Sequence, residues 1–357
     1  MINSQNLNDE LADLRGLADD IFSAWSETVL DVQKTTIPFD PTQWKTLHDS
    51  GLTLLTTPEA HGGSGASITE LAVVLSSAAH HCAPVPLAET DLLASWLLRV
   101  AGIAVPAIPL TAAYSPSLDI SDTHVTGTLD RVPWATMVDA IVVANDQRVA
   151  LVPVSNILIE AGCNLAHEPR DHLFIDTDLS VESIGPAPDR VRQEFDLRGA
   201  LARSIQICGV AERALAMTVQ HAGERRQFGH TLGKFQAVQA LVSDAAGAVA
   251  MARAATELAV TTVAAYGFLD PGTRFAIAVA KTQTASAAQK VSRNAHQVHG
   301  AIGFTLDHRL RHFTSRMLSW RSEFGSAHRW EQFLGEVAIG EGPSRVWNLI
   351  TSGQTTT

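Results

Sequence analysis

The segment ERRQFGHTLGKFQAVQ, residues 224–239, holds the side chains with the clearest potential for binding chemistry. Arg225 and Arg226 are adjacent, and Gly229 and Gly233 loosen the chain before the next helical stripe. Planar guanidinium groups bind phosphate through paired hydrogen bonds, so two arginines at such a turn suit a diphosphate. The same residues also fit a solvated basic turn that compensates the negative end of a helix. Residue types alone leave both interpretations open.

A second candidate binding segment is QVHGAIGFT, residues 297–305. Gly300 and Gly303 allow close approach of the backbone to a ligand, and they leave N–H groups free to face phosphate or ribose oxygens. A glycine-capped helix end followed by a turn has the same sequence pattern. In isolation, this segment is therefore also open to two interpretations.

The overall charge restricts the class of partner. The 357-residue chain has 26 Lys and Arg against 37 Asp and Glu, which gives a net charge of -11. A field of this sign repels nucleic acid and anionic membranes. We therefore expect no nucleic-acid partner and no membrane partner, and any anionic ligand must be held by local donors.

Targeting signals, cysteines and histidines point to an unexported, metal-free protein. The N-terminus is polar and acidic where a signal peptide needs a basic start and an apolar run, so we expect a cytoplasmic protein. We also expect no span of 18 uncharged apolar residues. Cys82, Cys163 and Cys208 are too far apart for a disulfide framework or a zinc site, and we expect them to be reduced and buried. The histidine pairs 296/299 and 308/312 have helical spacing, but without an HExxH motif we expect no metal.

Apolar spacing divides the chain into three predicted regions, and the predicted fold class is α+β. Residues 1–105 have helical periodicity, interrupted by a glycine-rich loop over residues 58–67 that ends at a serine N-cap. Residues 106–189 change to short β-branched runs, typical of a small central antiparallel β domain. Residues 190–357 return to long, alanine-rich helical stripes, which predict an up-and-down four-helix bundle.

The two binding segments, at this separation within a helical bundle, resemble those of the acyl-CoA dehydrogenase family. The similarity covers nearly the whole chain, and it implies the acyl-CoA dehydrogenase fold and FAD as cofactor. In that family an Arg-x-x-Phe-Gly element and a following glutamine, here Arg225, Phe228 and Gln236, reach the FAD of a neighbouring protomer. A later Gln-x-x-Gly element, here Gln297 and Gly300, takes its adenosine end.

Two upstream segments extend the resemblance. SGLTLLTTPEAHGGSG, residues 50–65, matches the helical N-terminal domain of the family. DRVPWATMVDAIVV, residues 130–143, matches the strand whose Trp and Thr, here Trp134 and Thr136, face the isoalloxazine ring. The resemblance thus implies contacts to both ends of the cofactor.

The resemblance also implies a reaction. A catalytic carboxylate removes the α proton of a CoA thioester while a hydride passes from the β carbon to flavin N5. The usual base lies in a Tyr-Glu-Gly-Thr segment, where this chain has SEFGSAH, residues 322–328, with Gly325 or its neighbour at that place. Other members carry the base on the helix before the arginine element, which here falls near Arg198 and Gly199. A carboxylate is missing from both positions.

Asp196 and Glu323 are the acids nearest to the two base positions. Each is offset by about two or three residues, which on a helix turns a side chain well away from the intended face. A charge near a helix N-terminus and a solvated surface acid are the more ordinary interpretations of these two residues. The sequence therefore offers them only as the nearest available acids.

Interface donors are retained, whereas the base is missing and the family's Thr-Glu-Pro flavin-binding stretch has no counterpart between residues 104 and 125. Losing a general base costs about 100- to 10,000-fold in rate, so something else must supply it. This pattern resembles the base-lacking partner subunits of actinobacterial heterotetrameric acyl-CoA dehydrogenases in steroid side-chain degradation. We predict a subunit of an FAD-dependent acyl-CoA dehydrogenase that introduces an α,β double bond into a steroid or fatty acyl-CoA.

The predicted partners are a homologous subunit in an α2β2 assembly and an electron-transfer flavoprotein as electron acceptor. One alternative is a self-sufficient homo-oligomer that uses Asp196 or Glu323 as a relocated base. The other alternative is a non-catalytic carrier of a CoA ester or flavin. Fold resemblance cannot separate these, because one fold hosts many functions.

Overall fold

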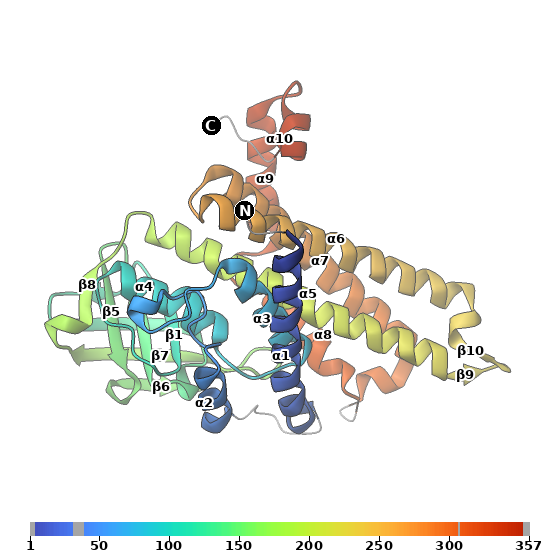
Figure 1. Cartoon of the computed structure of the whole chain (residues 1–357), viewed down its shortest axis with the longest axis horizontal. Coiled ribbons are helices and arrows are strands. Elements are labelled where there is room, and N and C mark those ends of the chain that lie inside the picture. Colours follow the sequence, from blue (N-terminus) through green and yellow to red (C-terminus); the bar gives the residue numbers. More distant parts are fainter. Residues whose placement is uncertain (1–3, 31–38, 306–307, 353–357) are drawn as a thin grey trace. The chain divides into compact units, whose positions relative to one another are not determined.

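The computed structural model describes residues 4–30, 39–305 and 308–352 of the chain (Figure 1). Contacts divide the chain into two compact units. The helical unit comprises Met1–Gln33, Ala72–Ala83 and Ala200–Thr357, and the sheet unit comprises Lys34–Leu71 and Pro84–Gly199. The boundaries at 105 and 189, which mark changes of apolar periodicity, stay a prediction.

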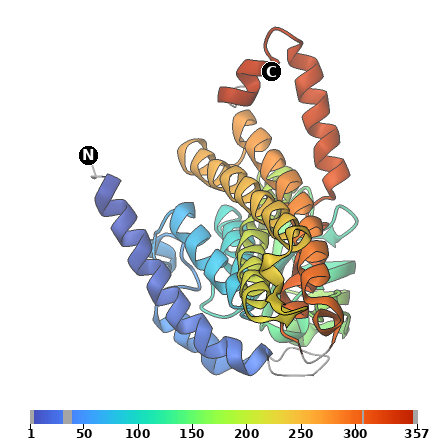
Figure 2. The same cartoon turned by 90° about the vertical axis from the view of Figure 1, so that its right-hand side faces the viewer.

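Long helices with apolar stripes form most of the helical unit. α6 and α7 pack along their lengths, α9 packs against α7, and α10 packs against α9 (Figure 2). α7 begins at an N-cap, where Asp270 accepts a hydrogen bond from the Thr273 N–H and proline follows it. The helices that lie in this unit or enter it are α1 (Ser4–Leu30), α3 (Ile68–His80), α5 (Val191–Glu224), α6 (Gln236–Tyr266), α7 (Pro271–His299), α8 (Leu310–Trp320), α9 (Ala327–Glu341) and α10 (Val346–Ser352).

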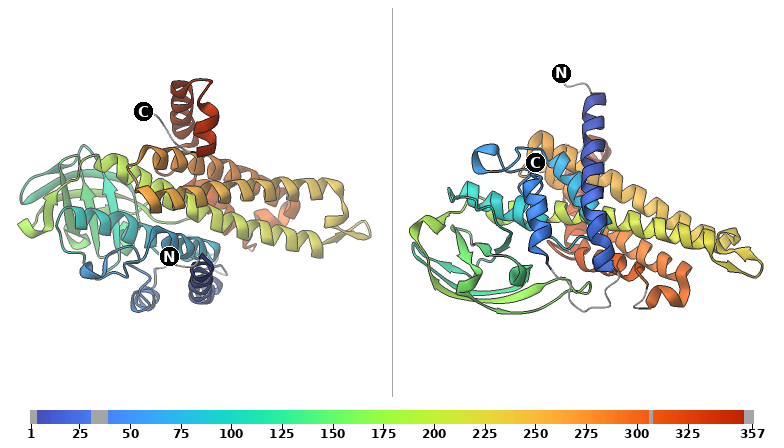
Figure 3. Two further views of the ribbon diagram at one scale, coloured as in Figure 1. Left: turned by 45° about the horizontal axis from the view of Figure 1, so that its top comes forward. Right: turned by 60° about the horizontal axis from the view of Figure 1, so that its bottom comes forward.

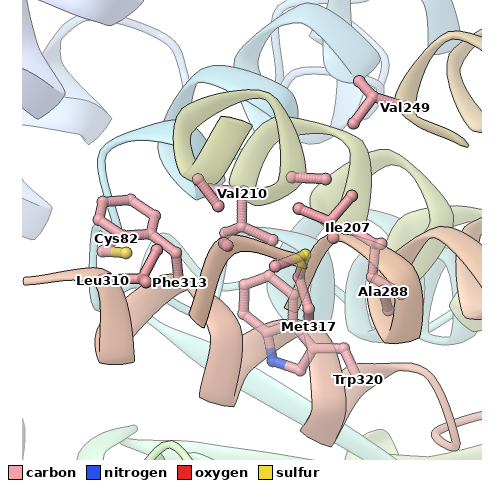
Figure 4. Close-up of a cluster of buried hydrophobic side chains, with 14 of the residues drawn as sticks. Cys82, Ile207, Val210, Val249, Ala288, Leu310, Phe313, Met317 and Trp320 are labelled. Atoms are coloured by element: carbon pink, nitrogen blue, oxygen red, sulfur yellow. The ribbon is translucent and has the colours of Figure 1, made fainter. Parts of the chain in front are cut away.

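The core of the helical unit joins α5 to α7 and α8. Ile207 and Val210 of α5 lie in one buried cluster with Phe313 and Met317 of α8 and Ala288 of α7 (Figure 4). Burying a large apolar side chain stabilises a fold by about 1.5–3 kcal/mol. This cluster therefore fixes the ends of α5 and α7, from which the binding segments extend.

Gly209 marks a close approach between α5 and α3. A Cβ atom at this position would lie 2.2 Å from the carbonyl oxygen of Ser76. Since real Cβ contacts do not come so close, only glycine permits the two backbones to touch here. The segment Ala72–Ala83 is thereby part of the helical unit despite its distance in sequence.

α6 is long and apolar enough, by length and composition, to cross a membrane. Asp244, Arg253 and Glu257 interrupt α6, so it is not a run of 18 uncharged apolar residues. A core helix of a globular protein passes the same test, and 44% of the apolar window of α6 is buried inside the protein. Its alanine-rich stripe packs against α7.

The sheet unit contains two four-stranded sheets. One has the order β1-β4-β5-β8 and the other β2-β3-β7-β6. All pairs are antiparallel except β1 and β4, which are parallel with Leu110 opposite Ala140. The strands are β1 (Leu110–Tyr114), β2 (Asp119–Ile120), β3 (His124–Pro133), β4 (Ala140–Ala144), β5 (Arg148–Pro153), β6 (Ile157–Glu160), β7 (Arg170–Asp178) and β8 (Ile184–Pro186).

The sheet unit also contains the short helical elements that follow the first helix of the chain. η2 is a π-helix that is buried throughout. These elements are α2 (Pro41–Asp49), η1 (Glu59–His61), η2 (Ala88–Ser95), α4 (Trp96–Val100), η3 (Ala135–Met137), η4 (Val154–Asn156) and η5 (Val181–Ser183). The predicted fold class, with N-terminal helices, a small β domain and C-terminal helices, is confirmed.

The predicted glycine-rich loop and its serine cap are present. Ser67 precedes α3, its hydroxyl accepts from the Thr69 N–H, and the Glu70 carboxylate accepts from the Ser67 N–H at 2.7 Å. This reciprocal arrangement is a capping box. Cys82 and Cys208 are buried as expected, but Cys163 is exposed, so the expectation for that residue was wrong.

Candidate functional site

Arg225 lies at the end of α5, where the chain turns into a short hairpin. β9 (Arg226–Gln227) pairs antiparallel with β10 (His230–Thr231), and η6 (Leu232–Lys234) leads from it into α6. Figure 3 shows this hairpin where α5 ends and α6 begins. Phe228 and Gly229 form the turn with φ of 50° and 80°, the left-handed geometry of a tight hairpin. The Phe228 side chain at this turn is 89% exposed.

Gln297 and Gly300 lie at the end of α7. Gly300 has φ 64° and ψ −146°, and a Cβ built there would meet nothing within 4 Å. The backbone conformation therefore requires glycine at position 300, and the space around it is open to a ligand. Gly303, within η7 (Gly300–Phe304), differs because a Cβ there would lie 2.9 Å from that of His299. Gln297 and Gly300 are both exposed.

Stacked histidine rings join the two binding segments. His221, in the last turn of α5, stacks on His299 of α7 with ring centroids 4.4 Å apart. His299 also meets the edge of His308 at 4.9 Å. The structure therefore brings the Arg225 hairpin and the Gly300 turn together at one end of the helical unit, as a shared ligand site requires.

The positive charge at this end comes from arginine and lysine, not from histidine. Burial lowers the pKa of His299 to about 4, and burial also lowers the pKa values of His221 and His308. The stack is therefore neutral at pH 7. Arg225 and Arg226 are exposed, and no hydrogen bond or ion pair within the described part of the chain engages their guanidinium groups. They are free to bind phosphate.

In the part of the chain that the structure describes, the histidine pairs lie apart from any cluster of metal-ligand side chains. Within the described residues there is no group of three His, Cys, Asp or Glu side chains placed to hold a metal ion. His296 instead pairs with the hydroxyl of Thr314 at 2.9 Å and stacks on Phe304. Burial lowers the pKa of His312 to about 4.

Trp134 and Thr136 lie in the sheet unit, just after β3. The expectation that they lie in a strand was wrong, because Trp134 has φ 60° and Thr136 lies in η3. Trp134 is buried, whereas Thr136 is exposed. The left-handed residue turns the chain sharply out of β3.

Asp171, at the start of β7, occupies the donors of Thr136. Its Oδ2 accepts from the Thr136 N–H at 2.9 Å and from the Thr136 hydroxyl at 3.1 Å, while its Oδ1 accepts from the Gly162 N–H at 3.1 Å. Asp171 is 1% exposed. A buried carboxylate that accepts three hydrogen bonds is firmly held. These Thr136 donors are therefore committed within the chain.

The donor sets consequently fit FAD at one end and not at the other. At the helical unit, the exposed side chains of Arg225, Gln236 and Gln297 present free donors that suit the diphosphate and adenosine, whereas the Gly300 N–H donates to the His296 carbonyl. At the sheet unit, the Thr136 donors that a flavin ring would need are bonded to Asp171. The chain's residues thus fit the nucleotide half and do not fit the redox ring.

The loop at the usual base position is closed by an indole ring. Gly325 has φ 108°, and a Cβ there would lie 2.6 Å from Nε1 of Trp330. The Trp330 indole is buried and donates to the carbonyl of Phe324 at 3.2 Å. Any side chain at position 325 would collide with this ring. The missing base is therefore part of a different loop structure and not a single substitution.

Glu323 is held by cations within the helical unit. Its carboxylate pairs with Arg203 at 2.7 Å, and Arg203 is 2% exposed. The ammonium group of Lys281 donates to the Trp320 carbonyl at 3.1 Å, and burial lowers the pKa of Lys281 to about 7. The expectation of a solvated surface acid was wrong for Glu323. A carboxylate fixed by a buried guanidinium is a poor proton acceptor.

Asp196 lies half-buried on α5, in the part that belongs to the sheet unit. Near the second base position, Arg198 pairs with Glu194 at 2.7 Å and lies over the Trp96 ring at 4.4 Å. A cavity of 590 Å³ in this unit is lined mainly by apolar side chains, with Asp139 as its acid. Asp196 does not line it, so its role as a base stays a prediction.

Sequence reasoning missed Asp171, Trp330 and the histidine stack. Asp171 belongs to an ordinary strand pattern, and its bonds to Thr136 span 35 residues. Trp330 reads as a core aromatic. The histidines were identified by helical spacing within one segment, whereas the stack joins His221 of α5 to His299 of α7.

Comparison with known proteins identifies the family. The acyl-CoA dehydrogenase N-terminal domain model matches residues 9–103, and the C-terminal domain model matches residues 193–329. Acyl-CoA dehydrogenase IpdE2 of Mycolicibacterium smegmatis is 26% identical over 303 residues, covering 81% of this chain and 86% of that protein.

Solved structures agree with this assignment. The ChsE4-ChsE5 complex from Mycobacterium tuberculosis superposes with a TM-score of 0.82 at 25% identity, covering 93% of this chain and 98% of the other. The Tcur3481-Tcur3483 steroid ACAD superposes with a TM-score of 0.81 at 25% identity, covering 94% and 100%. The two family models together span more than half of the sequence, and the chain therefore belongs to the acyl-CoA dehydrogenase family of FAD-dependent oxidoreductases.

Proposed function

We propose that this chain is the partner subunit of a hetero-oligomeric acyl-CoA dehydrogenase. It contributes Arg225, Phe228, Gln236, Gln297 and Gly300 to an FAD whose redox ring lies in a homologous subunit. That subunit also supplies the catalytic base. An electron-transfer flavoprotein is the proposed electron acceptor.

One asymmetry carries this proposal. The donors for the nucleotide half are exposed and free, whereas Asp171 engages Thr136 and Trp330 closes the loop at the base position. A self-sufficient enzyme needs both sets. A subunit that completes a neighbour's site needs only the first, and Phe228, exposed on a hairpin tip, suits burial against that neighbour.

The residues of this chain would hold and orient the cofactor. Arg225 can bind a diphosphate oxygen pair through its guanidinium fork, and the open space around the Gly300 Cα allows a close approach. The neutral histidine stack beneath them adds no competing charge at pH 7. When bound, FAD supplies the hydride acceptor for the desaturation of an acyl-CoA.

A steroid acyl-CoA is the proposed substrate class, with a fatty acyl-CoA as the alternative. The support is indirect, since a similar solved structure is named as a steroid ACAD of two components. The ChsE4-ChsE5 structure is likewise a complex of two named components. An α2β2 arrangement is proposed on the same ground.

The test is co-expression with a homologous acyl-CoA dehydrogenase subunit, followed by measurement of mass and of flavin absorbance per chain. Alone, the chain is expected to be colourless and unable to oxidise any acyl-CoA. The complex is expected to be yellow and active, and Arg225→Ala is expected to lower its flavin content. Arg192→Ala, which removes an exposed arginine elsewhere on α5, is the matched control. An isolated chain that carries one FAD and turns over acyl-CoA would overturn the proposal.

The two alternatives give other results in the same preparations. A relocated base predicts that Asp196→Ala or Glu323→Ala abolishes turnover of the isolated chain, with a loss of about 100-fold or more. A carrier predicts bound flavin or CoA ester without electron transfer in any combination of subunits. We favour neither, because Glu323 is paired with Arg203 and Asp196 lies outside the described cavity.

A further inference from the structure

The Arg225 side chain acts electrostatically on His221. The two residues are one helical turn apart, and the Arg225 N–H donates to the His221 carbonyl at 2.9 Å. After burial and the influence of His308, the positive charge of Arg225 is a further cause that lowers the pKa of His221. Whatever neutralises Arg225 therefore also changes the proton affinity of His221.

The stack extends this influence into the protein. His221 lies on His299 at a ring separation of 4.4 Å, and His299 meets His308 at 4.9 Å. The three rings come from α5, from α7 and from the residue two positions before α8. Burial lowers the pKa of each ring; in addition, His308 disfavours protonation of His221, and both His221 and His308 disfavour protonation of His299. The stack can accept one proton more easily than two.

The surroundings of the stack are mostly positive or neutral. Glu224 is the acid whose charge raises the pKa of His221, and its carboxylate is already bonded by Gln220 at 2.9 Å. The turn over Gly300–Phe304 carries no titratable side chain. Near the stack in sequence, Arg225 and Arg226 follow α5 and His296 lies on α7. His308 is preceded by Asp307, which lies outside the described residues, and is followed by Arg309 and Arg311.

We propose that the stack of His221, His299 and His308 takes up a proton when a diphosphate binds at Arg225. The ligand carries two negative charges to a place where the free protein presents uncompensated cations. It offsets the repulsion from Arg225, which after burial and His308 helps to keep His221 neutral, and replaces it with attraction. This inference rests on the proposed function, since it concerns the same cofactor-binding end of the chain.

A consequence for affinity follows by linkage. Protons that bind together with the ligand make its affinity rise as the pH falls. For one proton the limit is about tenfold per pH unit, between the pKa of the liganded stack and the lower pKa of the free stack. The direction is fixed by the sign of the ligand charge.

The test is an NMR pH titration of the full chain that follows the histidine ring signals with and without ADP-ribose. Its diphosphate is a diester, so the probe keeps a constant charge over the range tested. We expect the midpoint of the His221 ring signal to shift to higher pH at saturating ADP-ribose. The affinity, from the same spectra, is expected to be several-fold higher at pH 6 than at pH 8.

Two variants isolate the stack. His221→Phe keeps an aromatic ring on His299 but removes the ionisable group, so it is expected to bind ADP-ribose at pH 8 as the parent does and to lose most of the gain at pH 6. His328→Phe removes an exposed histidine on α9 and is expected to keep the full gain. Binding of equal strength at pH 6 and 8 with no shift of His221 would overturn the inference alone. Absence of ADP-ribose binding at every pH would overturn the proposed cofactor grip as well.

Discussion

Removal of the Asp171 carboxylate should destabilise the sheet unit by a predictable amount. Asp171→Ala deletes three hydrogen bonds to one charged acceptor, from the Thr136 N–H, the Thr136 hydroxyl and the Gly162 N–H. A hydrogen bond to a charged group contributes about 1.5–3 kcal/mol. Thr136 is exposed, so water can reach its freed donors, and the lower end of that range applies. Three bonds at about 1.5 kcal/mol each give an expected loss of about 4.5 kcal/mol in the free energy of unfolding.

Asp171→Asn provides a graded comparison. The amide oxygen can still accept from Thr136, but the amide nitrogen then faces the Gly162 N–H, which is also a donor. One mismatched pair costs about 1–3 kcal/mol, so the variant should lie between the parent and Asp171→Ala. Asp176→Ala, an exposed acid in the same strand, is the control and should change little.

Urea unfolding, followed by circular dichroism, measures these differences. Flavin absorbance of the same preparations shows whether freeing the Thr136 donors lets the isolated chain retain flavin. A change below about 1 kcal/mol for Asp171→Ala would refute the reasoning, because three bonds to a buried carboxylate could not then hold this turn.

Further predictions concern the closed loop, the buried lysine and the buried histidines. Gly325→Glu should give no dehydrogenase activity and should lower the melting temperature, because the new side chain meets Trp330. The control Gly340→Glu, at an open position on α9, should keep the melting temperature of the parent. Equal melting temperatures for the two variants would contradict this prediction. Lys281 has a pKa of about 7 against 10.5 when unfolded, so its contribution to stability rises between those pH values, and urea unfolding of Lys281→Met at pH 7 and 9 should lack that rise. His299 has a pKa of about 4 against 6.5, so stability should fall by about 3 kcal/mol from this group as the pH drops from 6.5 to 4, and a flat unfolding profile there would argue against its burial.

The arrangement of elements was predictable because it follows from local patterns. The apolar stripe from Phe235 to Val263 becomes α6, and the β-branched runs become β3 to β6, since these periods are fixed by which face is buried. The capping box at Ser67 needs only residues within one helical turn. The parallel pairing of β1 with β4 was not predicted, because which strands become neighbours is decided by topology.

The site residues were predictable only where a short continuous segment of sequence identifies them. Arg225 and Gly300 are identified by neighbours in sequence, and the structure places both in the open. The bond between Thr136 and Asp171 depends on the register of β3 and β7, which shifts between Leu129 and Val132. A register shift of this kind has no clear signature in one sequence. The same applies to the Trp330 ring over Gly325, which depends on how the chain folds back after α8.

The contact at Gly209 shows that the domain defined by sequence similarity differs from the unit defined by packing. The C-terminal family model covers residues 193–329, yet α5 is complete only with the Ser76 backbone lying against this glycine. A polypeptide cut to the matched boundaries would lack α3, and the surface of α5 around Gly209 would then be exposed to water. Inheritance and folding therefore use different borders in this chain, and an excised C-terminal segment should need residues 72–83 added back before it becomes soluble.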